Sequence, residues 1–234
     1  MKINHYEPMV QTYSKRIDNQ EAFKYQVFRL FTEACGGDLD EFTKIVYSRF
    51  VVEDFSYSDD WKYFNVLEYF KGKVIPHKVN VYQAGIELSR NEWFKELYID
   101  KAQFIENLWL HDISKFSANE SFGYAFHDFT SKELDLGFEM AWHHHKQVNE
   151  HHPEYWLNAN RSGKLEIIPM PKLFIVEMVA DWIGAGRTYG STLEKWLPDN
   201  IHKFVWHEKT AIELNAILSN IGIKTKIQGS TLFF

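Results

Sequence analysis

The sequence predicts an all-α fold, and three observations support this prediction. Apolar residues recur at three- and four-residue intervals through most of the chain after residue 74, which is the spacing of a buried helical face. Pro76 and Pro153 stand where two of these periodic runs begin and end, positions that suit proline at helix boundaries. Strand-like runs are confined to 164–168 and 222–234, and both are short.

The first part of the chain has helical character of its own. Residues 1–70 alternate helix-like runs, such as 22–34, with polar breaks at Gly36-Gly37 and 56–60. We therefore expect a helical N-terminal elaboration over 1–70, a main helical domain over 71–221 and a C-terminal tail over 222–234.

The helices of the main domain follow from the periodicity in order along the chain. The segment 117–133 carries a weaker pattern and is expected to be a looser connector. The expected helices cover residues 77–88, 101–112, 134–152, 172–186, 191–204 and 208–221.

Composition excludes several classes of function. The formal net charge of −6 argues against a dedicated nucleic-acid-binding protein, which needs a positive face to neutralise phosphates. Cys35 is the single cysteine, so no internal disulfide can form. No run approaches the ~20 apolar residues of a membrane span, and the first residues lack the apolar core of a signal peptide. We expect a cytoplasmic protein with no membrane or nucleic-acid partner, either monomeric or a homo-oligomer.

Four residues with carboxylate or imidazole side chains indicate a metal site. His111 and Asp112 close an apolar helix, and Asp181 lies on an apolar helical stripe beside the small residue Gly184. His77 opens another helix, 34 residues before His111. Buried carboxylates are costly unless something pairs with them, and a divalent ion is a natural partner of imidazole and carboxylate. Taken singly, each residue has a plainer interpretation: a histidine satisfied within the core, or an aspartate paired with Arg187.

The order and spacing of these four residues resemble the HD metal-dependent phosphohydrolase superfamily. His77 precedes the His111-Asp112 pair by 34 residues, and Asp181 follows Asp112 by 69. The resemblance implies an HD-domain-like helical bundle in which His77, His111, Asp112 and Asp181 hold a divalent ion. A second pair, His127-Asp128, sits in a polar segment and is set aside.

Two positions after the HD pair bear on the reaction. Glu120 matches an acid that the 5′-deoxynucleotidase branch of the superfamily carries, whereas Lys115 stands where that branch has a glutamate. Lys115 instead matches the HD-x-x-K form of cyclic-dinucleotide phosphodiesterases and HD-type oxygenases, in which the lysine contacts substrate oxygens. The resemblance thus implies that Lys115 neutralises phosphate charge and that Glu120 positions water or protonates the leaving oxygen.

A longer resemblance is to an uncharacterised phage and bacterial family without an established activity. Its motifs HDxSKF, AWxHHxxxNxHHxxYW and MPxxxxxEMVADWxGAGR correspond to residues 111–116, 141–156 and 170–187.

The second of these motifs holds five of the 11 histidines, within residues 143–152. In HD proteins with two metals, additional histidines between the HD pair and the last aspartate hold the second ion, and His144 and His152 are the candidates here. Alternatively, this segment binds the substrate phosphate, through His145, Asn149 and His151. Arg187, at the end of its helix, is a further candidate for binding the phosphate. A polar, solvent-facing helix is the plainer interpretation of the segment.

The expected function is metal-dependent hydrolysis of a small anionic phosphoester, with a nucleotide as the substrate class that the resemblance implies. One or two divalent transition-metal ions (Mn, Co, Fe or Zn) are the expected cofactors, with Mg as a further candidate. Two other classes stay open at this point: an HD-type di-iron oxygenase, and a non-catalytic protein that binds and sequesters a nucleotide.

Overall fold

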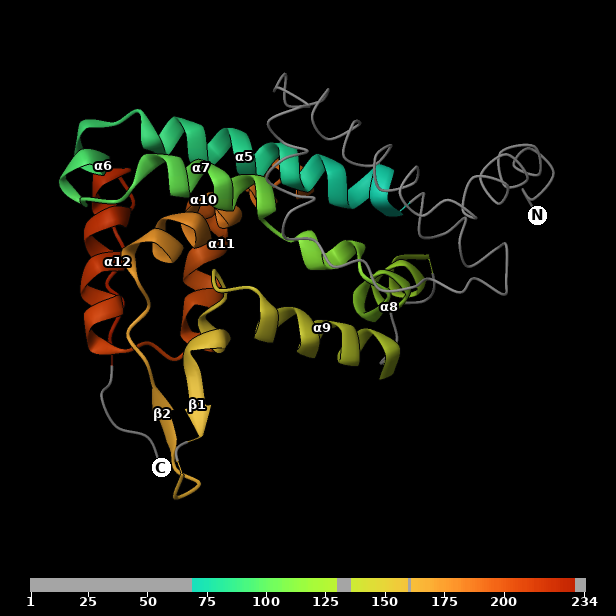
Figure 1. The fold of residues 1–234 in the computed structure, drawn as a ribbon. Coiled ribbons are helices and arrows are strands. Elements are labelled where there is room, and N and C mark those ends of the chain that lie inside the picture. The colour runs from blue at the N-terminus through green and yellow to red at the C-terminus, as the bar shows by residue number, and fades with distance from the viewer. Residues whose placement is uncertain (1–68, 130–135, 160, 230–234) are drawn as a thin grey trace. The chain divides into compact units, whose positions relative to one another are not determined.

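The computed structural model describes residues 69–129, 136–159 and 161–229. The expected N-terminal elaboration over 1–70 lies outside the described residues apart from its last two positions, and so do 230–234. The all-α prediction is confirmed, because helices dominate the described chain and its sheet has two strands (Figure 1). The chain divides into two compact units, one of residues 1–76 and 113–142 and the other of 77–112 and 143–234. The expected domain boundaries at 71 and 222 stay predictions.

The described part of the first unit is a small aromatic core. It contains the π-helical turn η2 (Phe70–Val74), the 3-10 turn η3 (Ile113–Phe116), α8 (Ala118–Phe129) and the first half of α9 (Leu136–Val148). The buried residues that form this core are Tyr69, Phe70, Val74, Phe116 and Ala125. The segment 117–133, expected to be a loose connector, contains α8, because Phe122 and Ala125 place one face of the helix on this core.

Among the described residues, the second unit holds most of the helices and one short hairpin. Helices α5 and α7 run side by side, and the hairpin projects away from the helices of its unit (Figure 1). The hairpin pairs β1 (Leu157–Ala159) antiparallel with β2 (Leu165–Ile167), Asn158 opposite Glu166. The helical elements are α5 (Ile75–Ser89), α6 (Glu92–Glu96), α7 (Lys101–Leu110), η4 (Pro153–Trp156), α10 (Lys172–Tyr189), α11 (Leu193–Asn200), η5 (Ile201–Lys203) and α12 (Glu208–Asn220).

Helix α10 is the central element of this unit. It contacts α7, α11 and α12, and half of its 18 residues are buried. Its Gly184 allows a close approach of α5, because a Cβ at this position would lie 2.6 Å from the backbone nitrogen of Val81. His77 lies one turn before Val81, and Asp181 lies nearly one turn before Gly184. The same contact therefore brings these two predicted ligands together.

Two predicted helices end earlier than the periodicity indicated. Helix α7 ends at Leu110, so His111 and Asp112 form the turn after it, and Asp112 has the positive φ of 54°. Helix α9 ends at Val148, so His151 and His152 lie in the following turn. Each pair of side chains is therefore directed by a turn rather than by helical periodicity.

The tail packs on its own chain as far as the structure describes it. The expected strand is not formed over 222–229; instead the side chain of Asn215 in α12 pairs with both backbone groups of Ile227, at 2.8 Å each. Ile223 and Ile227 are buried in the core of the second unit. Within the described residues, no helix has the length and apolar character needed to cross a membrane.

Candidate metal centre

The four residues predicted to bind metal meet in the second unit. His77 comes from the first turns of α5, His111 and Asp112 from the turn after α7, and Asp181 from α10. The Nε2 atom of His77 lies 3.2 Å from Oδ2 of Asp112 and 3.1 Å from Oδ1 of Asp181. The Nε2 atom of His111 lies 3.6 Å and 3.4 Å from the same two oxygens. We call these four residues the first group.

A buried lysine holds the turn that carries His111 and Asp112. Lys78, next to His77, is fully buried, and its Nζ donates to the carbonyl of Trp109 at 3.1 Å and to the carbonyl of His111. The last carbonyls of a helix have no partner within it, so this ammonium satisfies the end of α7. Aspartate also tolerates the left-handed conformation found at Asp112. Lys78 and this conformation together direct the Asp112 carboxylate.

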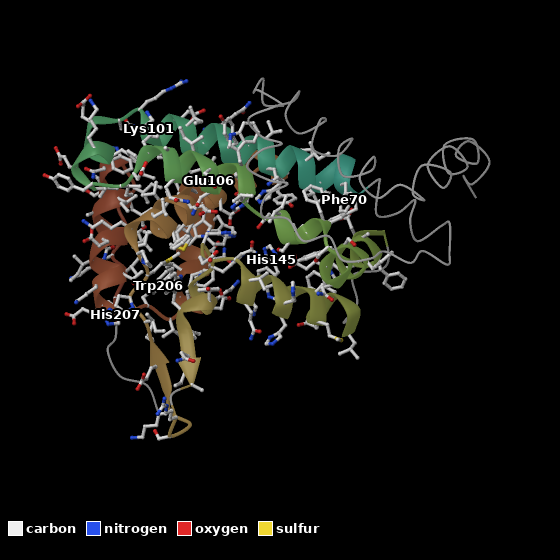
Figure 2. All side chains as sticks on the ribbon, in the orientation of Figure 1. Phe70, Lys101, Glu106, His145, Trp206 and His207 are labelled. Carbon is white, nitrogen blue, oxygen red and sulfur yellow. The ribbon has the colours of Figure 1, made fainter. Side chains whose placement is uncertain are left out.

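A second group of potential ligands shares Asp112 with the first. The Oδ1 atom of Asp112 lies 3.2 Å from Nε2 of His145 and 3.4 Å from Nε2 of His151. His152 completes this group, since one ligand atom from each of the four residues lies within 4.8 Å of the others. His145 leaves α9 near its C-terminal end (Figure 2). The two oxygens of Asp112 therefore face two different sets of histidines.

Asn149 supports the second group. Its amide nitrogen donates to the carbonyl of His145 at 2.8 Å and lies 3.1 Å from Nδ1 of the same residue. Asn149 is buried at the end of α9. It therefore orients the His145 side chain.

Glu177 joins the two groups and was not among the residues predicted from the sequence. Its Oε1 atom lies 3.2 Å from Nδ1 of His111 and 3.4 Å from Nδ1 of His151. The residue is buried on α10, one turn before Asp181. The signal was present in the sequence, because an acid four residues before Asp181 shares its helical face inside the apolar run 173–180.

The electrostatics of the cluster reflect burial opposed by close pairing. Burial lowers the pKa of His111, but Asp112, Asp181 and Glu177 outweigh it and raise the pKa to about 9. Burial raises the pKa of Glu177, but His111 and His151 outweigh it and lower the pKa to about 2. Asp181 behaves likewise: burial opposes the shift, and the neighbouring imidazoles of His111 and His77 hold its pKa well below the ordinary value. Burial, reinforced by His151 and His145, lowers the pKa of His152 well below the ordinary value, so this imidazole is neutral.

The donor atoms fit a divalent ion. Ligand atoms about 2.1 Å from a tetrahedral zinc ion lie about 3.4 Å from one another. The nitrogen–oxygen distances in the first group are 3.1 to 3.6 Å. The buried Nε2 atoms of His111 and His151 also make no hydrogen bond to any residue that the structure describes. Such unsatisfied nitrogens are costly, and a metal ion would use them. The cluster is therefore compatible with a metal site.

The remaining predicted site residues are placed differently. His144 lies next to His145 on α9 but belongs to none of the ligand groups found among the described residues. Arg187 forms a two-pronged ion pair with Glu87, with contacts of 3.1 and 2.6 Å. Lys115 and Glu120 belong to the first unit, where the Lys115 ammonium lies 5.6 Å from the centre of the Tyr124 ring and Glu120 is fully buried. The catalytic roles of Lys115 and Glu120 stay predictions.

One comparison with known proteins identifies a relationship. The profile of a family of unknown function (DUF5662) matches residues 67–222, two thirds of the chain, and its span includes all three of the motifs quoted above. Neither the curated proteins nor the solved structures include a match to this chain.

Proposed function

Because the chain belongs to the family of unknown function DUF5662, we propose its activity from the site: metal-dependent hydrolysis of a nucleotide or a related small phosphoester. The observation that carries the proposal is the position of Asp112, whose two oxygens face two histidine-containing groups. A carboxylate shared in this way is suited to two neighbouring divalent ions, the arrangement found in many phosphoester hydrolases.

The residues divide between two ions as follows. The first ion would be held by His77, His111 and Asp181, and the second by His145, His151 and His152, with Asp112 shared between them. Imidazole nitrogen together with carboxylate oxygen favours Mn²⁺, Co²⁺, Fe²⁺ or Zn²⁺ over Mg²⁺, which prefers oxygen ligands and retains water.

When bound, such ions would polarise a phosphoryl oxygen and make hydroxide available near neutral pH. The protein's own groups determine the approach of the substrate. The Asp181 side chain is 15% exposed, whereas those of His77 and Asp112 are 5% and 2% exposed. We therefore place the entry of water and phosphate on the Asp181 side, with the buried histidines behind it.

The resemblance to HD phosphohydrolases adds two roles to the proposal. The Lys115 ammonium would neutralise charge that develops on the phosphate, and the Glu120 carboxyl would position water or protonate the leaving oxygen. These are the roles to test once hydrolysis is measured.

The test combines metal content with activity. Purified protein is reconstituted with Mn²⁺, Co²⁺, Fe²⁺ or Zn²⁺, and its metal is measured by mass spectrometry. Phosphate release is followed on a panel of nucleoside monophosphates, and ring opening of cyclic dinucleotides to linear products is followed by chromatography. We expect Asp181→Asn to reduce activity by more than about 100-fold, since removing a ligand costs more than removing a supporting residue. The matched control is Asp199→Asn on the exposed face of α11. Full metal content and full activity in Asp181→Asn would refute the assignment. Bound metal with unchanged nucleotide after long incubation would favour a binding protein.

The histidine-rich second group also supports a second candidate, an HD-type di-iron oxygenase. Three imidazoles with a shared carboxylate suit non-haem iron as well as they suit the other transition metals. Oxygen consumption by the iron-loaded protein distinguishes this candidate, because phosphoester hydrolysis consumes no oxygen.

A further inference from the structure

Glu177 makes contacts with each of the two ligand groups. Its Oε1 atom lies 3.2 Å from Nδ1 of His111, in the first group, and 3.4 Å from Nδ1 of His151, in the second. Its Oε2 atom accepts a hydrogen bond from the Asn107 amide at 3.2 Å, and Asn107 in turn accepts one from Gln103 at 3.0 Å. Asn107 of α7 therefore holds Oε2 of this buried carboxylate, while Oε1 faces the two histidines.

The hydrogen positions of the two histidines follow from these contacts. An ionised carboxylate can only accept hydrogen bonds, so the Nδ1 atoms of His111 and His151 must each carry a hydrogen. A neutral imidazole protonated on Nδ1 has its free electron pair on Nε2. The Nε2 atom of His111 lies 3.4 Å from Asp181, and the Nε2 atom of His151 lies 3.4 Å from Asp112. Each electron pair is thus on the side of the ring where the proposed ions would bind.

We propose that Glu177 is a positioning residue that fixes His111 and His151 in the same tautomer and so prepares both metal groups together. This inference rests on the proposed metal site and deepens it. Helix α10 carries Glu177 and Asp181 one turn apart, so a ligand and the support of two other ligands share one rigid element. His77, the other histidine of the first group, has no such support, because its Nδ1 has no hydrogen-bond partner among the described residues.

A competing arrangement would make Glu177 itself a ligand. The atoms of Glu177, His111 and His151 are close enough to hold an ion at the two Nδ1 positions. That arrangement would leave the buried Nε2 atoms of both histidines unsatisfied beside Asp181 and Asp112, at the cost of two lost hydrogen-bonding groups. If Glu177 instead supports the two histidines, their Nδ1 atoms donate to its carboxylate and their Nε2 atoms bind the ions, so all four ring nitrogens have a partner.

The experiment determines the tautomers of His111 and His151 by NMR spectroscopy. Protein labelled with ¹⁵N-histidine is loaded with Zn²⁺, which is diamagnetic, and long-range ¹H–¹⁵N correlation spectra show which ring nitrogen carries hydrogen and which binds zinc. Zinc affinity is measured in parallel by competition with a chelator, for wild type, Glu177→Gln and Glu177→Leu. The matched controls are Glu213→Gln and Glu213→Leu, in a surface ion pair with Lys172.

We expect hydrogen on Nδ1 and zinc on Nε2 for both His111 and His151 in the wild type. Glu177→Leu should weaken zinc binding to both groups by about 10- to 100-fold. Glu177→Gln, which keeps an accepting oxygen, should recover part of that loss, and the Glu213 variants should match the wild type. Zinc on Nδ1 of either histidine, or unchanged affinity and tautomers in Glu177→Leu, would overturn the inference.

The outcomes separate this inference from the proposed function. Zinc bound through Nε2 at both histidines without hydrolysis of any phosphoester leaves the inference standing and refutes the proposed activity. Hydrolysis by a protein that binds zinc through Nδ1 of either histidine supports the proposed activity and refutes the inference. A wild-type protein that binds none of Zn²⁺, Mn²⁺, Co²⁺ and Fe²⁺ refutes both. If Glu177→Leu fails to fold, the wild-type tautomers and the Glu177→Gln variant still decide the question.

Discussion

Gly184 of α10 lies directly against Val81 of α5. A Cβ at Gly184 would stand 2.6 Å from the Val81 backbone nitrogen and 2.7 Å from its Cα. Backbone atoms cannot move aside as the end of a flexible side chain can, so the two helices approach this closely only with glycine here. The contact lies next to the pair formed by His77 and Asp181, 3.1 Å apart.

Gly184→Ala is therefore expected to separate α5 from α10 and to weaken the metal site. Overpacking of a buried contact costs about 1–3 kcal/mol, which for a chain of this size lowers Tm by about 2–12 °C. Metal affinity should fall as well, because His77 and Asp181 move apart. Thermal unfolding and metal titration measure the two effects. Gly72→Ala is the control, since a Cβ there meets nothing within 4 Å. Equal Tm and equal metal affinity for both variants would contradict the packing argument.

Lys78→Met is expected to disturb the turn at His111 and Asp112. The substitution keeps the unbranched apolar stem of the buried side chain but removes the donor to the carbonyls of Trp109 and His111. A buried acceptor left without its partner costs about 1–3 kcal/mol. The free energy of unfolding should fall by at least that amount, and metal content should decrease because Asp112 is no longer directed toward both groups. Lys95→Met, on an exposed side chain paired with Glu92, is the comparison that should change neither quantity.

Metal binding is expected to release protons at neutral pH. In the metal-free protein His111 has a pKa of about 9, raised from 6.5, so it is protonated at pH 7.5 and must lose a proton to bind metal. Metal affinity should therefore rise between pH 6.5 and 9. Calorimetric titrations in two buffers of different ionisation enthalpy measure the number of protons released. Equal heats in both buffers would show that no proton leaves.

The same shifts define the pH range in which the metal-free protein is most stable. The raised pKa of His111 contributes stability that is complete below pH 6.5 and is lost as the pH rises through about 9. The lowered pKa of Glu177 contributes stability that is present above pH 4.5 and is lost as the pH falls through about 2. The lowered pKa of His152 removes stability as the pH falls below 6.5, because the unfolded imidazole then gains a proton that the folded one does not, so the three contributions together place the maximum near pH 6.5. Denaturant unfolding of the metal-free protein across this range measures it.

The sequence was sufficient for the helical class, because that class depends on periodicity. His77, His111, Asp112 and Asp181, which the resemblance to the HD superfamily groups, lie close together in the structure. Local spacing did not predict the turns. A helix over 134–152 is expected from the periodicity, whereas α9 ends at Val148 and the following turn brings Nε2 of His151 to 3.4 Å from Oδ1 of Asp112. Arg187 illustrates a similar limit, since its partner Glu87 lies 100 positions away in the sequence. Side chains placed by long-range contacts and left-handed turns cannot be read from local spacing.

Metal stoichiometry gives the sharpest test of the two groups. If Asp112 serves two ions, His77→Ala should remove the ion of the first group and His152→Ala the ion of the second, each leaving about one equivalent bound. Asp112→Asn should weaken both, because each of its oxygens faces one group. His202→Ala, an exposed histidine of η5, is the control that should keep the full metal content. Mass spectrometry of the reconstituted variants measures the equivalents. One equivalent in the wild type that is lost in His77→Ala but kept in His152→Ala would show a single ion in the first group, with the second group left for substrate.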